Sequence, residues 1–305
     1  MQLTMRPPGA ALVSFADSVG SVGPVAVLGG HTQWDVGGPV AAEVRLVRAP
    51  AGIVELEPAE LVVRCGAGTT VAELDAALAA HGQMSPIDAA HPDATVGGVL
   101  SVGQSGIRRL RYGHVRDLVL EARYVAADGQ LVKAGAPVVK NVTGYDLCRM
   151  LVGSLGTLGL IGEVVLRCRP LPAVREWFSS GTADPFALRR SLFGASSILW
   201  DGQRTWLLLE GDVAEVRAGR ASLPGAWQPS VAPALPAGRS SMRPSELRSL
   251  PLTTGTGWLA EIGVGTVHGL ARPDAPLAAP ALGLCRDLKR TYDPYGRLNP
   301  GRQPW

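Results

Sequence analysis

Glycines gathered in three short stretches are the residues of this 305-residue chain whose type and spacing most suggest chemistry. In the last stretch Gly153, Gly156, Gly159 and Gly162 recur at every third residue. That period matches neither a buried helix face nor one face of a strand, and glycine weakens both elements from within. The spacing indicates a backbone that needs unusual dihedral angles or lies against a flat or charged group. A tight connection packed under a sheet is the alternative.

The first stretch, GGHTQWDVGG at residues 29–38, follows a short apolar segment over residues 25–28 that is typical of a strand. A glycine-rich loop after a strand can cradle a phosphate, because its exposed backbone N–H groups point at the anion. The loop lacks the Gly-Lys-Ser/Thr of a P-loop and the GxGxxG of a dinucleotide fold, and no helical pattern follows it.

The second stretch, ATVGGVLSVGQSG at residues 94–106, combines a candidate helix cap at Thr95 with the Gly97-Gly98 pair. Small residues continue through Ser105 and Gly106. Small side chains allow a bulky planar ligand to approach the backbone, so this segment is a second candidate binding loop.

Candidate catalytic side chains are few. Arg108, Arg109 and Arg111 follow the second stretch, and guanidinium groups suit a phosphate or a substrate carboxylate. A solvated turn explains the same arginines equally well. His268 is the best candidate for a general base among five histidines, although a histidine in a surface loop is the simpler interpretation.

Composition restricts the class of protein. Apolar residues make up 46% of the chain and charged residues 18%, as in a globular protein with a substantial core. The net charge of +3, without a run of Lys or Arg, argues against nucleic-acid binding. No membrane-spanning segment or leader pattern is recognisable, so we expect a cytoplasmic protein. The four scattered cysteines predict buried thiols and no metal site.

The first 170 residues alternate short strand and helix patterns, which predicts an α+β fold and not a doubly wound one. Thr70 and Glu73 form a capping-box signature, and Asp128-Gly129 marks a hairpin. The expected elements are a helix at 10–19, strands at 53–56 and 61–65, a helix from 71, a hairpin over 118–134, a helix before Gly153 and a strand over 158–168.

After Leu171-Pro172 a second domain is expected. Its pattern is strand, helix, strand, strand, helix, strand, which is the ferredoxin-like order. The expected elements are 177–180, 185–193, 198–200, 206–210, 214–221 and a last strand at 258–264, with a Pro/Ser-rich loop at 224–251. The tail continues with an amphipathic helix and the turn-rich YDPYGRLNPGR at residues 292–302.

KNVTGYDLCRMLVGSLGTLGLIGEV at residues 140–164 resembles the signature of FAD-binding oxidoreductases of the vanillyl-alcohol oxidase or PCMH type. The E-type subunits of bacterial glycolate oxidase are the branch that it most resembles. D-type subunits usually carry Glu where this chain has the uncharged Leu155. The tail is similar to the family's C-terminal DP…NPG motif.

This resemblance implies an FAD-binding domain over residues 1–170, a short ferredoxin-like cap domain over 171–280, and a segment over 281–305 that returns to the FAD domain. It implies FAD contacts at Gly29, Gly30, His31, Thr32, Gln33, Thr95, Gly97, Gly98, Ser101, Ser105, Gly106, Gly153, Gly156, Thr157, Gly159, Ile161 and Asn299.

The implied activity is oxidation of a 2-hydroxy acid such as glycolate or D-lactate. D-type flavoprotein and iron–sulfur subunits are the implied partners, with peripheral attachment to the membrane through them. Because the cap looks short and no catalytic histidine cluster is present, an accessory FAD-binding or scaffold subunit is the alternative. Gly29-Gly30-His31 also echoes a motif whose histidine is bonded to flavin, and a simple loop histidine is the other interpretation.

Overall fold

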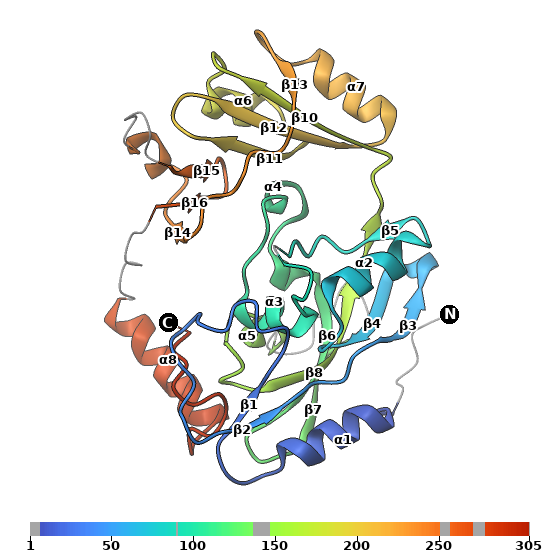
Figure 1. The fold of residues 1–305 in the computed structure, drawn as a ribbon, viewed down its shortest axis with the longest axis vertical. Coiled ribbons are helices and arrows are strands. Elements are labelled where there is room, and N and C mark those ends of the chain that lie inside the picture. The colour runs from blue at the N-terminus through green and yellow to red at the C-terminus, as the bar shows by residue number, and fades with distance from the viewer. Residues whose placement is uncertain (1–6, 90, 137–146, 251–256, 271–277, 305) are drawn as a thin grey trace. The chain divides into compact units, whose positions relative to one another are not determined.

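The computed structural model describes residues 7–89, 91–136, 147–250, 257–270 and 278–304 (Figure 1). The chain forms two compact units. Unit 1 comprises Met1–Gly106, His114–Pro170 and Leu277–Trp305, and unit 2 comprises Ile107–Gly113 and Leu171–Pro276. The chain therefore leaves unit 1 for a short excursion at 107–113, which the sequence did not suggest, and residues 277–305 belong to unit 1.

Unit 1 is built on a five-stranded antiparallel sheet. In spatial order its strands are β3 (Ile53–Glu57), β4 (Val62–Gly66), β8 (Leu160–Arg167), β6 (Val119–Val125) and β7 (Leu131–Gly135). The predicted hairpin forms β6 and β7, where Gly129 has φ of 84° and Gln130 N–H donates to Asp128 Oδ1 at 3.0 Å.

Helices and short strands complete unit 1. The two strands β1 (Val25–Val27) and β2 (Arg45–Val47) pair in parallel, and β5 (Gln83–Met84) pairs with β9 (Arg169–Pro170). The helices are α1 (Ala10–Val19), α2 (Val71–Ala79), α3 (Val96–Val102), α5 (Leu147–Leu151) and α8 (Ala279–Tyr292), with 3-10 turns at Pro58–Glu60 and Val115–Leu118.

Local sequence explains where these helices begin. The Thr70–Glu73 capping box is present in both directions at the start of α2, and Thr95 accepts a hydrogen bond from Gly98 N–H at the start of α3. Leu74, Leu78 and Leu100 from these helices are fully buried in one core cluster with Cys65 and Cys168. Cys148 is buried as well, and Cys285 on α8 is partly exposed.

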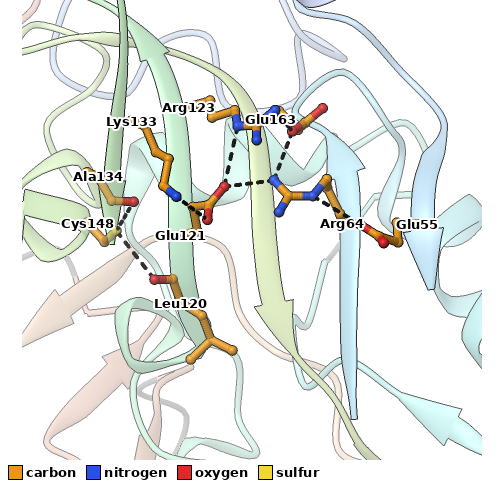
Figure 2. A network of polar contacts seen from close by, with 9 residues as sticks. All are labelled: Glu55, Arg64, Leu120, Glu121, Arg123, Lys133, Ala134, Cys148 and Glu163. Carbon is orange, nitrogen blue, oxygen red and sulfur yellow. Dashed lines mark hydrogen bonds and ion pairs between the residues drawn. The ribbon is translucent and has the colours of Figure 1, made fainter. Parts of the chain in front are cut away.

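The opposite face of the sheet in unit 1 carries a buried ion-pair network in addition to the apolar residues that pack against α1 (Figure 2). Arg64 Nη1 lies 2.8 Å from Glu121 Oε1 and 3.1 Å from Glu163 Oε1. Arg123 Nη1 lies 3.2 Å from Glu163 Oε1. Glu163 lies on β8, and its carboxylate is buried between the two arginines.

The C-terminal segment is fixed to unit 1 by a buried arginine. The Arg297 guanidinium donates to the carbonyls of Gly23, Ala127 and Val19 at 2.9, 2.9 and 2.8 Å. Leu298 is fully buried and bridges Val25 in parallel, so the tail extends the β1–β2 pair.

Unit 2 contains a seven-stranded antiparallel sheet in the order β13-β10-β12-β11-β15-β16-β14. Its elements are α4 (Arg109–Tyr112), β10 (Val174–Ser180), α6 (Pro185–Ser191), β11 (Ala195–Trp200), β12 (Thr205–Gly211), α7 (Val213–Ala221), β13 (Gln228–Ser230), β14 (Arg239–Ser241), a 3-10 turn at Glu246–Ser249, β15 (Leu259–Glu261) and β16 (Thr266–His268).

The ferredoxin-like order is confirmed, but the position of its fourth strand was predicted wrongly. The sub-sheet β13-β10-β12-β11 has the 4-1-3-2 arrangement, and its fourth strand is β13 at 228–230, inside the segment that we expected to be a loop. Residues 258–264 are not one strand either: a turn at Ile262–Gly265 separates β15 from β16, with φ of 82° at Gly263 and 94° at Gly265. A three-residue strand rich in polar residues and proline leaves no periodicity to detect.

Candidate functional site

A cavity in unit 1 brings together the three glycine stretches and the C-terminal segment. Its lining residues from the predicted set are Gly29, Gly30, His31, Thr32, Gln33, Thr95, Gly97, Gly98, Ser101, Gly156, Ile161 and Asn299.

The first loop presents backbone donors to this cavity. Between the strand β1 and the turn at Val36, the N–H groups of residues 29–35 donate to no acceptor among the residues that the structure describes. His31 has a positive φ of 61°, and its ring stacks on Trp34 with centroids 4.9 Å apart. A run of free N–H groups at a cavity wall suits an anionic group such as a pyrophosphate.

Close packing explains the glycine pair of the second loop. Gly97 N–H donates to Ala67 O at 2.7 Å, and a Cβ at Gly97 would lie 2.9 Å from that oxygen. A Cβ at Gly98 would lie 3.0 Å from the Thr95 hydroxyl that caps α3. These glycines let α3 approach β4 closely while its first turn lines the cavity.

The third loop adopts two successive left-handed conformations, at Leu155 with φ of 52° and at Gly156 with φ of 70°. Leu155 N–H donates to Ser101 O at 2.8 Å, which joins this loop to α3. A Cβ at Gly156 would overlap the side-chain amide of Asn299. Since leucine rarely adopts a positive φ, neighbouring contacts must hold this turn in place.

Asn299 connects the strand β1, which leads into the first loop, to the third loop. Its Nδ2 donates to Leu155 O at 2.6 Å, and its Oδ1 accepts from Val27 N–H at 3.1 Å. Asn299 itself has φ of 44°, a conformation that asparagine tolerates better than most residues. The tail therefore forms part of the cavity wall.

Sequence reasoning missed two residues at the cavity, Arg302 and Trp34. The Arg302 guanidinium donates to the carbonyls of Val36 and Gly38 and lies 4.8 Å from the centre of the Trp34 ring. Burial lowers the pKa of Arg302 below its ordinary value, and the charge of Asp35 opposes this effect. The signal available in the sequence was the unusual tryptophan and arginine within two glycine-rich motifs.

Five of the residues implied as FAD contacts lie outside the cavity lining. Ser105 Oγ accepts from Val115 N–H at 3.0 Å and lies 3.2 Å from His114 Nδ1, and Gly106 packs on Asp88. Gly153, Thr157 and Gly159 are likewise not among the lining residues. Thr157 Oγ1 donates to Ser154 O at 2.8 Å, so it stabilises the third loop from behind. Residues 140–146 of the signature lie outside the described residues.

The candidate catalytic residues all lie in unit 2. Arg111 Nη2 lies 2.8 Å from Glu215 Oε1, and Arg109 is on the same short helix α4. Beside them, burial and the Glu210 carboxylate raise the pKa of Tyr112 to about 12. His268 is buried on β16 and is not in a surface loop, and its Nε2 lies 2.8 Å from Glu261 Oε1.

Within the part of the chain that the structure describes, no cluster of His, Cys, Asp or Glu could hold a metal ion. Across the same residues, no helix is both long and apolar enough to span a membrane.

The residues around the cavity fit FAD. The free N–H groups at 29–35 can donate hydrogen bonds to its pyrophosphate, and the small residues at the start of α3 leave room for a flat ring system. The apolar part of the cavity wall includes Ile161, Leu155 and Trp34. No nucleotide-binding helix of the Rossmann type is needed for this arrangement.

Comparison with known proteins agrees with this site. Residues 11–135 match the family model described as an FAD binding domain. The glycolate oxidase subunit GlcE of Escherichia coli (strain K12) is 31% identical, with 92% of each chain covered. A D-lactate dehydrogenase of Archaeoglobus fulgidus is 38% identical, but the match covers 52% of this chain and 36% of that protein. The glycolate oxidase subunit GlcD of Bacillus subtilis is 32% identical over 41% of this chain and 27% of its own length.

Solved structures show the same fold at low sequence identity. An alkyldihydroxyacetonephosphate synthase aligns with a TM-score of 0.70 at 16% identity, covering 95% of this chain and 73% of its own. The 6-hydroxy-D-nicotine oxidase of Arthrobacter nicotinovorans aligns with a TM-score of 0.54 at 17% identity, covering 73% of this chain and 53% of its own. With the match to GlcE along almost the whole length, the chain belongs to the FAD-binding oxidoreductases of the PCMH type that include the glycolate oxidase subunit GlcE.

Proposed function

We propose that this chain is the FAD-binding subunit of a 2-hydroxy acid oxidoreductase similar to glycolate oxidase, with glycolate or D-lactate as substrate. The observation that carries the proposal is one cavity in which all three glycine stretches and the NPG tail meet. The likeness to GlcE over 92% of both chains supports the assignment of the reaction class.

In this proposal, FAD supplies the two-electron redox chemistry, and the protein supplies binding, orientation and electrostatics. The first loop holds the anionic pyrophosphate with its N–H groups, while α3 and the third loop flank the ring system. Asn299 and Arg302 fix the first and third loops in the geometry that the cofactor requires. Unit 2 serves as the cap domain, and Arg109, Arg111 and His268 are its candidate residues for the substrate.

Partner subunits are part of the proposal. We expect a D-type flavoprotein and an iron–sulfur subunit to assemble with this chain, since a GlcE-like and a GlcD-like protein are both among its relatives. We place the complex in the cytoplasm, held at the inner membrane face through these partners.

The test is the visible spectrum of the purified chain, recorded without oxygen before and after addition of glycolate or D-lactate. The proposal predicts flavin absorbance that bleaches with at least one of the two acids. Flavin that stays oxidised with both acids, alone and with the partner subunits present, would show an accessory flavoprotein instead. Acid precipitation of the same sample tests His31, because a covalently bonded flavin stays with the protein.

A further inference from the structure

Four strands of unit 2 bring a polar cluster onto one face of the sheet. In the register, His268 on β16 pairs with Arg239 on β14 and with Leu259 on β15, and Glu261 on β15 pairs with Leu199 on β11. Because side chains alternate along a strand, all five project from the same face. Their strand neighbours Ala260, Val267 and Ile198 point the other way, into the apolar core of unit 2.

The side chains of this cluster are joined by short contacts. His268 Nε2 lies 2.8 Å from Glu261 Oε1, and Arg239 Nη2 lies 3.9 Å from the same oxygen. Arg239 Nη2 also donates to Thr266 Oγ1 at 3.3 Å. An ionised carboxylate can only accept, so Nε2 is the donor in this contact.

Two buried oxygens beside this cluster lack a partner. Glu261 Oε2 and Ser197 Oγ are buried, and neither makes a hydrogen bond among the described residues. Glu261 is only 1% exposed, and a buried carboxylate oxygen without a hydrogen-bond donor is destabilising. An acceptor kept in this state at a buried site points to a ligand that donates a hydrogen bond to it.

The cluster therefore offers a cation and an unpaired acceptor within a few strand spacings. The Arg239 side chain is 22% exposed, so the cluster has one partly exposed edge. A guanidinium suits a carboxylate, because its N–H groups form a planar fork. The acceptor Glu261 Oε2 suits a hydroxyl that donates.

We propose that Arg239, Glu261 and His268 form a recognition site for a small 2-hydroxy acid, with Arg239 on its carboxylate and Glu261 Oε2 on its hydroxyl. His268 donates through Nε2 to Glu261 Oε1 and so positions the Glu261 carboxylate. This assignment rests on the proposed function for the identity of the ligand. It adds Arg239 and Glu261 to the residues that the sequence suggested, and it predicts selectivity for an acid with a hydroxyl over the same acid without one.

The test compares binding of tartronate and malonate, which differ by one hydroxyl, to the full FAD-loaded chain by calorimetry. We expect tartronate to bind about tenfold tighter, which corresponds to about 1.4 kcal/mol. Arg239→Met should weaken binding of both acids at least tenfold, and Glu261→Gln should reduce the preference for tartronate while malonate still binds. Ser241→Ala, on the same strand and face as Arg239, is the matched control and should bind both acids as the native chain does.

Equal affinity for the two acids in the native chain would overturn the site, as would equal effects of Arg239→Met and Ser241→Ala. If Arg239→Met does not fold, Arg239→Lys replaces it, since an ammonium keeps the charge but lacks the planar fork; unchanged binding in that variant counts against the site. Flavin bleaching by glycolate with no Arg239-dependent binding refutes the site alone. Arg239-dependent binding without bleaching refutes the proposed reaction and leaves the site intact.

Discussion

At the residue scale, the cavity depends on a few backbone positions that the sequence revealed and on side-chain contacts that it could not reveal. Glycine at position 156 was identified by its spacing, and the structure gives the reason in its positive φ and its contact with Asn299. The left-handed backbone of Leu155, with φ of 52°, could not be predicted, because leucine rarely adopts this conformation.

Substitution of Gly156 by valine should abolish FAD binding in a chain that still folds. A valine at φ of 70° is strained, and its Cβ would displace the Asn299 amide that joins two binding loops. The bound FAD per chain is measured by absorbance after gel filtration, with folding checked by circular dichroism. Gly283→Ala is the control, since nothing lies within 4 Å of its added Cβ. A folded valine variant with full FAD content would show that Gly156 has no part in the cofactor site.

FAD affinity should be sensitive to the change of a single side-chain atom at Asn299. Asn299→Asp keeps the acceptor for Val27 N–H but replaces the donor to Leu155 O with a second acceptor, so two oxygens would face each other at 2.6 Å. We expect FAD affinity to fall at least tenfold, about 1.4 kcal/mol, and Asn299→Ala to have a smaller effect. Calorimetric titration with FAD measures both variants. An aspartate variant that binds FAD as tightly as the native chain contradicts this role.

At the element scale, the sequence predicted the helices and strands that have strong local signals and missed those that have weak ones. The capping box of α2 and the hairpin of β6 and β7 form as expected, because cap and turn chemistry is local. The strand β13 was missed and 258–264 was read as one strand, since three-residue strands carry no reliable periodicity. The ion pairs of Glu163 on β8 could not be predicted from the sequence either, because the partner arginines lie on β4 and β6, far away along the chain.

These ion pairs should contribute strongly to the stability of unit 1. Glu163→Gln removes the negative charge that lies 3.1 Å from Arg64 and 3.2 Å from Arg123, and it leaves two buried cations with less compensation. We expect the free energy of unfolding to fall by about 3–5 kcal/mol. Urea denaturation monitored by circular dichroism provides the measurement. Lys133→Gln is the control, since Lys133 is one-third exposed and its pair with Glu121 should contribute at most about 1 kcal/mol. Equal losses in the two variants would contradict the network's importance.

At the scale of the whole molecule, the order of the motifs along the chain identified the fold more securely than any single motif. Each glycine loop was ambiguous alone, and the structure shows why together they were not: loops separated by more than a hundred residues line one cavity. The excursion of 107–113 into unit 2 could not be foreseen, since α4 is held there by contacts such as Arg111 with Glu215. The reach of Arg302 to the first loop depends equally on long-range folding.

The isolated chain should oxidise glycolate slowly, and partner subunits should raise its rate. The reason is that the relative similar over 92% of both chains is one subunit of a glycolate oxidase, which implies that further chains take part in the reaction. Steady-state assays with an artificial electron acceptor compare the chain alone with the chain plus D-type and iron–sulfur subunits. Turnover by the chain alone at the rate of the assembled complex would refute this dependence.

Titration of the purified, flavin-free chain with FAD tests the central claim most directly. Calorimetry gives the stoichiometry, and tryptophan emission reports the site, because Trp34 lines the cavity. We predict one FAD bound per chain, with quenching that is markedly smaller in Trp34→Phe than in the native protein. A folded chain that takes up no FAD, or that binds it with the same quenching after Trp34→Phe and the same affinity after Gly156→Val, would contradict the assignment of this cavity as the flavin site.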